Sequence, residues 1–160
     1  MPPGKVKIVS GGQTGVDRAA LHAALEVGLP VGGWCPKGRL AEDGVIPAEL
    51  PLQETDSADY AVRTEKNVLD SDGTLVLSAG PLQGGTELTV KLALRHGKPL
   101  TVVDIANPPD LFNLTRWARD HGISVLNVAG PRESTRPGIY LAAKRFLLEF
   151  FREWQKQGTK

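Results

Sequence analysis

Residues 6–34 read VKIVSGGQTGVDRAALHAALEVGLPVGGW, and this stretch predicts a strand, a helix and a second strand. Residues 6–9 form a short, mostly β-branched run that is closed by glycines. Residues 16–27 are rich in Ala and Leu at helical spacing and stop at Gly28, a residue type typical of helix C-termini. Residues 29–34 resemble another short strand, so the whole stretch indicates a βαβ unit.

The rest of the chain repeats this alternation. Helices are expected over residues 57–69, 86–96, 108–121 and 139–157, and strands over residues 73–78, 100–103 and 123–128. Residues 35–51 contain Pro and Gly breaks and predict a long functional or covering loop. Strands that alternate with helices imply a mainly parallel sheet with helices on both faces. We therefore expect one Rossmann-like α/β domain over residues 1–160.

The composition is that of an ordinary globular protein. Of the 160 residues, 41% are hydrophobic and 23% are charged, which excludes a disordered tail or a coiled coil. The net charge of +1 disfavours bulk binding to nucleic acid, although residues 81–160 carry twelve basic and seven acidic groups, a local excess of +5. One cysteine, Cys35, excludes an internal disulfide. Residues 1–7 lack the apolar stretch of a leader, and no apolar run is long enough to span a membrane. We therefore expect a cytoplasmic protein.

Three glycine-rich segments follow predicted strands: SGGQTG at residues 10–15, GPLQGGT at residues 80–86 and NVAGPRES at residues 127–134. Glycine lets backbone N–H groups approach a ligand, and a following helix adds unpaired donors and partial positive charge. Each segment alone is also consistent with a tight turn. Together they predict a phosphate or nucleotide site, with these candidate residues: Gly11, Gly12, Gln13, Thr14, Gly15, Gly84, Gly85, Thr86, Gly130, Arg132 and Ser134.

Further cations lie near the first segment. Arg18 falls in the first turn of a predicted helix, where a cation opposes the helix dipole. It therefore pairs with Asp17 or with an acidic loop residue, or it meets an anionic ligand. Lys37 and Arg39 either reach over the sheet edge to an anion or belong to a solvated loop. We expect Arg18, Lys37, Arg39 and Arg132 to form the cationic side of the pocket.

Candidate acids and bases are Asp17, Glu42 and Asp43. The spacing Thr14-x-x-Asp17 also matches a capping box, which gives Asp17 a structural explanation. No metal-ligand spacing is present, because the three histidines fall on or at the ends of three different predicted helices, so neither zinc nor another protein-bound metal is expected. Cys35 is interpreted as structural. The Walker A and dinucleotide fingerprints are absent from the first loop.

Several longer motifs carry a family resemblance. They are SGGQTGVDRAAL at residues 10–21, GGWCPKGRLAEDG at residues 32–44, Arg63-Thr64 with Asn67, DSDGT at residues 70–74, GGT at residues 84–86 and NVAGPRES at residues 127–134. These motifs cover nearly the whole chain, which resembles the family of putative molybdenum carriers. That family is named for its similarity to an algal protein that binds the molybdenum cofactor.

The resemblance implies a Rossmann-like fold similar to the lysine-decarboxylase-like phosphoribohydrolases and the DprA/Smf recombination-mediator domain. It also implies a carrier of molybdenum cofactor (molybdopterin) or a nucleotide. The phosphoribohydrolases share Pro-Gly-Gly-x-Gly-Thr-x-x-Glu, whose Glu is catalytic, whereas this chain has Thr89 at that position. Two alternatives to a carrier stay open: a nucleotide-processing hydrolase and, with less support, a nucleic-acid-binding domain.

The last predicted helix is unusually apolar. Ile139, Ala143, Phe146, Phe150 and Trp154 form one stripe that is sufficient to pack on the sheet. Leu147, Leu148 and Phe151 fall on adjoining faces, which indicates either a deeply buried helix or an interface. We expect a homo-oligomer, a dimer or tetramer, that uses this helix.

Overall fold

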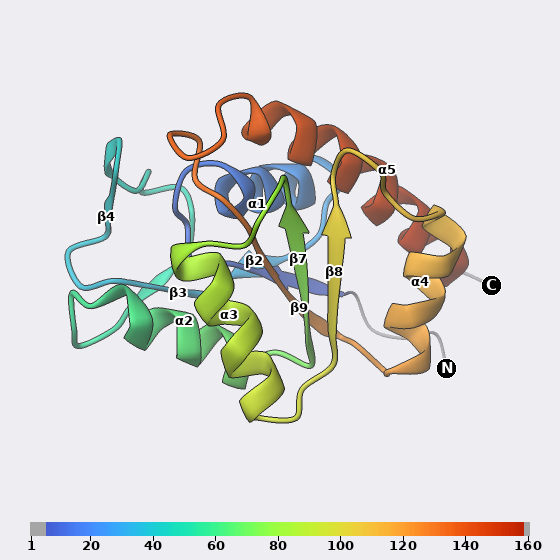
Figure 1. Cartoon of the computed structure of the whole chain (residues 1–160), viewed down its shortest axis with the longest axis horizontal. Helices are drawn as coiled ribbons and strands as arrows, with labels where there is room; N and C mark the ends of the chain where they lie inside the picture. The colour runs from blue at the N-terminus through green and yellow to red at the C-terminus, as the bar shows by residue number, and fades with distance from the viewer. Residues whose placement is uncertain (1–5, 159–160) are drawn as a thin grey trace.

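The computed structural model describes residues 6–158, with a five-stranded sheet between two layers of helices (Figure 1). The strands lie in the order β2-β1-β9-β7-β8, and every neighbouring pair is parallel. Their bounds are β1 (Lys7–Val9), β2 (Val31–Gly32), β7 (Gly73–Ser78), β8 (Leu100–Asp104) and β9 (Val125–Ala129). The predicted α/β fold class is confirmed.

Helices α1 (Val16–Glu26), α4 (Leu111–Asp120) and α5 (Ile139–Gly158) cover one face of the sheet. Helices α2 (Tyr60–Leu69) and α3 (Gly84–Arg95) cover the other face. Leu75 and Leu77 of β7 belong to the first core, with α1, α4 and α5. Thr74, which precedes Leu75, accepts a hydrogen bond from Asn127 of β9 on the opposite face. This alternation along β7 explains why a buried strand carries both leucines and hydroxyl side chains.

Helix α5 is buried on more than one side, because it packs against both α1 and α4. Leu147 and Phe151, which the sequence left outside the first apolar stripe, are fully buried in the core of the same chain. Leu148 is half-buried and also packs on that core. The reasoning from uncovered apolar faces to an oligomer is therefore wrong, although the oligomeric state itself stays a prediction.

Residues 33–54 contain more structure than the predicted loop. Strand β3 (Trp34–Cys35) pairs with β6 (Gln53–Glu54), and β4 (Leu40–Ala41) pairs with β5 (Gly44–Val45) as an antiparallel hairpin. Ile46, Leu50 and Leu52 anchor this region in a small core of their own. We refer to the hairpin, residues 40–45, as the strap.

None of the helices within residues 6–158 combines the length and apolarity needed to cross a membrane. Residues 1–5, on which the expectation about a leader rests, lie outside the described part of the chain.

The strand order decides where the glycine-rich segments lie. Strands β1, β9 and β7 are neighbours, and all are parallel, so the segments that follow them emerge at one edge of the sheet. From β1 the chain crosses through α1 to β2, and from β7 it crosses through α3 to β8, in opposite directions and over opposite faces. In open α/β sheets, ligands bind at such a change of direction.

Candidate functional site

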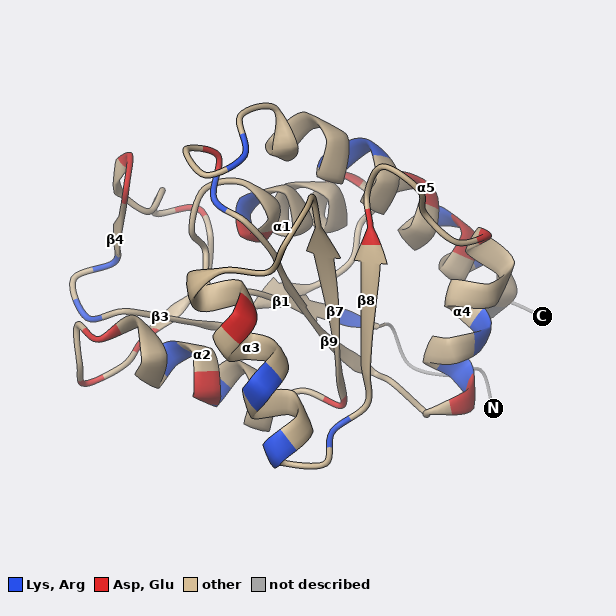
Figure 2. Cartoon of the chain, in the orientation of Figure 1, with Lys and Arg blue, Asp and Glu red and all other residues tan. Residues whose placement is uncertain are grey.

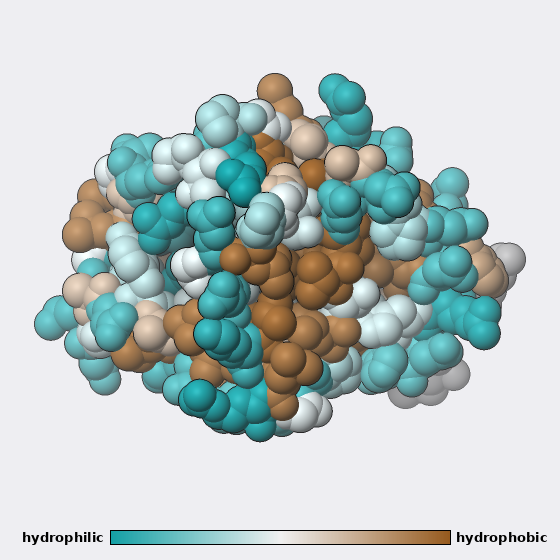
Figure 3. Space-filling view, in the orientation of Figure 1, coloured by the Kyte–Doolittle hydropathy of each residue, from teal (hydrophilic) through white to brown (hydrophobic). Residues whose placement is uncertain are grey.

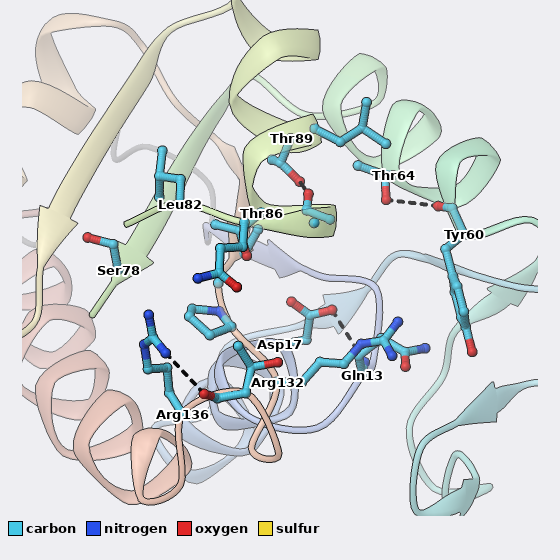
Figure 4. Close-up of a pocket in the computed structure, with 18 of the residues that line it drawn as sticks. Gln13, Asp17, Tyr60, Thr64, Ser78, Leu82, Thr86, Thr89, Arg132 and Arg136 are labelled. Carbon is cyan, nitrogen blue, oxygen red and sulfur yellow. Dashed lines mark hydrogen bonds between the residues drawn. The ribbon is translucent and has the colours of Figure 1, made fainter. Parts of the chain in front are cut away.

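A cavity of about 460 Å³ opens at this carboxyl edge of the sheet (Figure 4). Its walls come from the segment after β1, from α2, from the end of β7 with the start of α3, and from the segment after β9. Among the candidate ligand-binding and acid–base residues, those that line the cavity are Gln13, Asp17, Gly84, Gly85, Thr86, Gly130 and Arg132. All three glycine-rich segments therefore contribute to one cavity.

The other candidate residues lie outside its lining. They are Gly11, Gly12, Thr14, Gly15, Arg18, Lys37, Arg39, Glu42, Asp43 and Ser134. Lys37 is exposed. Arg39 donates hydrogen bonds to the carbonyls of Pro47, Leu50 and Leu52, which gives it a structural role beside the strap. Arg18 is buried, and its guanidinium pairs with Asp43 at 2.6 Å.

The capping box predicted at the start of α1 is wrong. Gly15 is the N-cap residue, and no side chain caps this helix. The N–H of Val16 instead donates to the carbonyl of Pro131, in the segment after β9, at 3.2 Å. The Thr14 hydroxyl accepts from the N–H of Glu133 at 3.2 Å instead of from the helix end, and it donates to Glu42.

The N–H groups at the start of α5 also donate to a group of the protein, the side chain of Glu133. The Glu133 carboxylate accepts from the N–H of Gly138 at 2.6 Å and from the N–H of Tyr140 at 2.9 Å. A carboxylate at this position satisfies the helix end as a bound anion would. The first N–H of α1 and the start of α5 are thus each occupied by a group of the protein itself.

The start of α3 differs from both. Its N-cap Gln83 makes no side-chain capping hydrogen bond, and a Cβ built at Gly84 or Gly85 would meet nothing within 4 Å. The first N–H groups of a helix have no carbonyl four residues back inside the helix. Gly84, Gly85 and Thr86 all line the cavity. The N–H of Thr86 donates to the carbonyl of Gln83 at 3.1 Å, so the open end that α3 presents to the cavity consists of the N–H groups of Gly84 and Gly85.

Three arginines line the cavity: Arg63 of α2, and Arg132 and Arg136 of the segment after β9. Figure 2 shows this basic segment close to the carboxyl ends of the central strands. Arg136 is held by the carbonyls of Ala79 and Thr135. The Arg132 guanidinium lies 4.8 Å from the ring centroid of Tyr60, a cation–π contact, and makes no hydrogen bond with another described residue.

Arg63 is the functional candidate that the sequence analysis missed. Its side chain is 11% exposed, its Nε is buried without a partner, and within residues 6–158 its guanidinium makes no hydrogen bond. Burial lowers the pKa of this guanidinium, which Asp17 partly opposes. A Cβ at Gly11 would lie 2.0 Å from its Nη1, so the glycine makes room for Arg63. The quoted Arg63-Thr64 motif was the available signal, but no glycine-rich segment adjoins it.

Asp17 of α1 faces Arg63 across the cavity wall. Its Oδ2 accepts from the N–H of Gln13 at 3.3 Å and lies 3.5 Å from Nη1 of Arg63. Figure 4 shows the second carboxylate oxygen directed away from Gln13. Burial raises the pKa of Asp17, with Arg63 opposing the shift. A buried carboxyl of this kind, at a cavity, is typical of groups that exchange protons.

Thr89, which stands where the phosphoribohydrolase motif has its glutamate, lines the cavity. Its hydroxyl donates to the carbonyl of Gly85 at 2.8 Å. Glu87 is exposed, lies outside the lining and pairs with Lys91 at 3.0 Å. The departure noted in the sequence therefore changes the chemistry of the cavity itself.

Trp34 and Cys35 do not line this cavity. The Trp34 indole donates to Asp70 at 2.7 Å, and the Lys66 ammonium lies 4.3 Å from its ring. Cys35 is buried, and burial raises the pKa of its thiol. Across residues 6–158, no group of three or more His, Cys, Asp and Glu side chains is arranged to hold a metal ion.

Two comparisons identify relatives of this chain. Residues 8–151 match the model of the circularly permutated YpsA SLOG family. A crystal structure named "Putative molybdenum carrier protein", from Syntrophus aciditrophicus SB, is 49% identical, with a TM-score of 0.85, over 93% of this chain and 96% of that one. No curated protein matches.

The family match covers most of the chain, and the similar structure has the same fold over nearly its full length. The sequence resemblance to molybdenum carriers is therefore confirmed at the level of the family. This chain belongs to the circularly permutated YpsA SLOG family.

Proposed function

We propose that the cavity binds a small ligand that carries a phosphate group, either a nucleotide or the molybdenum cofactor. The observation that carries the proposal is the open N-terminus of α3 in a cavity with three arginines, while the N-termini of α1 and α5 are occupied by Pro131 and Glu133. Arg63 and Arg132 have no hydrogen-bond acceptor among the described residues, and phosphate oxygens accept from both guanidinium and helix N–H groups.

The non-phosphate part of the ligand would lie against Tyr60, Leu82 and Leu88, which line the same cavity. Tyr60 is 38% exposed, and its ring offers an aromatic wall for a planar ring. The relative from Syntrophus is named a molybdenum carrier. The molybdenum cofactor is a phosphate-bearing pterin, so its phosphate would meet the same arginines.

Calorimetric titration tests this function. Nucleoside 5′-monophosphates and molybdopterin are compared with the nucleosides and with a pterin that lacks phosphate. A charge-assisted hydrogen bond contributes about 1.5–3 kcal/mol, so Arg63→Met should weaken the phosphate-bearing ligand by about ten- to a hundredfold. Lys37→Met is the matched control, because Lys37 is exposed and outside the cavity. Equal affinity with and without phosphate, or equal loss in both variants, contradicts the proposal.

A second candidate function is hydrolysis of an N-glycosidic or phosphate bond in a nucleotide-like ligand. It is favoured by Asp17, the one candidate acid or base that lines the cavity, whose pKa burial raises. Such a pKa suits general acid–base catalysis. Incubation with a nucleotide panel, followed by chromatography of the products, separates an enzyme from a carrier. Product formed by the natural chain but not by Asp17→Asn supports hydrolysis, and intact nucleotide after saturating binding supports a carrier.

A further inference from the structure

The strap is attached to the rest of the molecule at its base, at its tip and at Leu40, whose carbonyl accepts from the Gln13 side-chain amide at 3.0 Å. At its base, Arg39 donates to the carbonyls of residues 47, 50 and 52, and Ile46 is buried. Between base and tip, the apolar side chains Leu40 and Val45 are 50% and 66% exposed, so they contribute little packing. At its tip are two consecutive carboxylates, Glu42 and Asp43.

Glu42 reaches two different segments. Its Oε2 accepts from the Thr14 hydroxyl and from the N–H of Ser134, and its Oε1 accepts from the Ser134 hydroxyl. Neither Thr14 nor Ser134 lines the cavity, but both lie next to residues that do. Thr14 adjoins Gln13, and Ser134 lies in the stretch between Arg132 and Thr135. One carboxylate thus joins the segment after β1 to the segment after β9.

Asp43 secures the same arrangement from the other side. It pairs with Arg18, whose guanidinium also donates to the carbonyl of Gly12 at 3.0 Å. Arg18 is 8% exposed, so the pair fixes a buried cation beneath the glycine-rich segment. The strap tip therefore holds residues 12–14 through both of its carboxylates.

We infer that Glu42 is a positioning residue that holds Arg132 at the cavity by joining these two segments. Its three hydrogen bonds run from neutral donors to an ionised carboxylate, so they are charge-assisted. If Glu42 is removed, the segment after β9 retains two hydrogen bonds to the region after β1, from Val16 N–H to Pro131 and from Glu133 N–H to the Thr14 hydroxyl, but loses the three that Glu42 accepts. Arg132 then samples more positions, and the ligand must restrict them on binding.

Hydrogen exchange and phosphate binding together test this role, of which only the binding part rests on the proposed function. In Glu42→Ala we expect faster exchange at Val16, whose N–H donates to Pro131 and does not touch Glu42. Affinity for inorganic phosphate, measured by calorimetry, should fall at least fivefold. Glu42→Gln, which can still accept from one segment, should recover part of both effects. Glu49→Gln is the matched control, because Glu49 is exposed and makes no hydrogen bond or ion pair within residues 6–158.

The outcomes separate the two proposals. Unchanged exchange at Val16 in Glu42→Ala overturns the positioning role, as does increased exchange with unchanged phosphate affinity. If the natural chain does not bind phosphate or any nucleotide, the proposed function fails, while faster exchange in Glu42→Ala still supports the tie between the segments. Should Glu42→Ala not fold, Ser134→Ala removes one of the same hydrogen bonds. Combined with Glu42→Gln, it should show non-additive effects on exchange.

Discussion

Arg18 shows that the surroundings of a residue decide its role. A cation in the first turn of a helix is unfavourable by itself. Asp43 compensates it from the strap, and the carbonyl of Gly12 takes two further N–H groups. The sequence predicted that Arg18 needs an anion and named an acidic loop residue as one choice. It could not select Asp43, because the pairing depends on how a distant loop folds.

The Arg18–Asp43 pair should make stability depend on pH. The hydrogen bond from Arg18 lowers the pKa of Asp43 below its ordinary value. A carboxyl whose pKa is lower in the folded state adds stability above its unfolded pKa, about 3.9, and loses it as the pH falls through the folded pKa. Asp43→Asn should therefore cost up to about 1 kcal/mol at pH 7, because one partner is exposed, and the difference should shrink below about pH 4. Urea denaturation at both pH values measures it, and a constant difference contradicts this account.

Gly130 should tolerate no side chain. A Cβ at this position would lie 2.5 Å from the Val16 side chain and 2.6 Å from the carbonyl oxygen of Leu77. Because one neighbour is backbone of the central strand, Gly130→Ala should reduce the free energy of unfolding by about 1–3 kcal/mol. Gly85→Ala is the control, since its Cβ meets nothing within 4 Å. Chemical denaturation should show a loss for Gly130→Ala alone, and equal stability of the two variants is the contrary result.

At the level of elements, periodicity predicted all five helices and the five strands of the main sheet. The two-residue strands between residues 34 and 54 escaped prediction because so short a segment has no measurable period. The α1 cap was wrong because a carbonyl from the segment after β9, far away in sequence, replaced the local Thr14. Local patterns therefore predicted the elements, whereas contacts between elements decided their ends.

Substitutions on the face of α5 that carries Phe151, which the sequence analysis assigned to a possible interface, should destabilise the fold. Phe151 is fully buried against the core of its own chain. Phe151→Ala should therefore lower the free energy of unfolding by about 3–5 kcal/mol. Leu141, 67% exposed on the same helix, is the control, and Leu141→Ala should change stability by less than about 0.5 kcal/mol. Thermal or urea unfolding distinguishes them, and a small loss for Phe151→Ala means that its burial depends on something outside this chain.

On the scale of the whole molecule, the sequence predicted that glycine-rich segments would meet at one edge of the sheet. It could not predict that β9 lies between β1 and β7, which is what places Arg132 opposite Arg63 of α2. It also placed Lys37 and Arg39 at the pocket because they are cations in a loop near that edge. Arg39 instead donates hydrogen bonds to the carbonyls of Pro47 and Leu50 beside the strap. Position along the chain predicted the loops of the site but only one of its arginines.

The predicted homo-oligomer can be tested through α5. Leu141 is the one strongly exposed large apolar side chain on the described part of this helix, and a single leucine does not make an interface. We expect Leu141→Asp to leave the solution mass unchanged in light scattering. A fall to the monomer mass of 17.2 kDa would establish α5 as the interface. An unchanged mass above that value would direct attention to the apolar surface over α3 and β8, where Leu94 and Val102 are 66% and 45% exposed (Figure 3).

The position of β9 also has a consequence during synthesis on the ribosome. Of the strands within residues 6–158 it is the last to leave the ribosome, yet it belongs between β1 and β7, which are made much earlier. Until it arrives, the nascent chain carries two strands whose facing edges have no partner, and open strand edges favour aggregation. The sheet can therefore close only after residue 129 has been translated. A ribosome that stalls before residue 125 would leave a product suited to chaperones and proteases rather than a smaller folded domain.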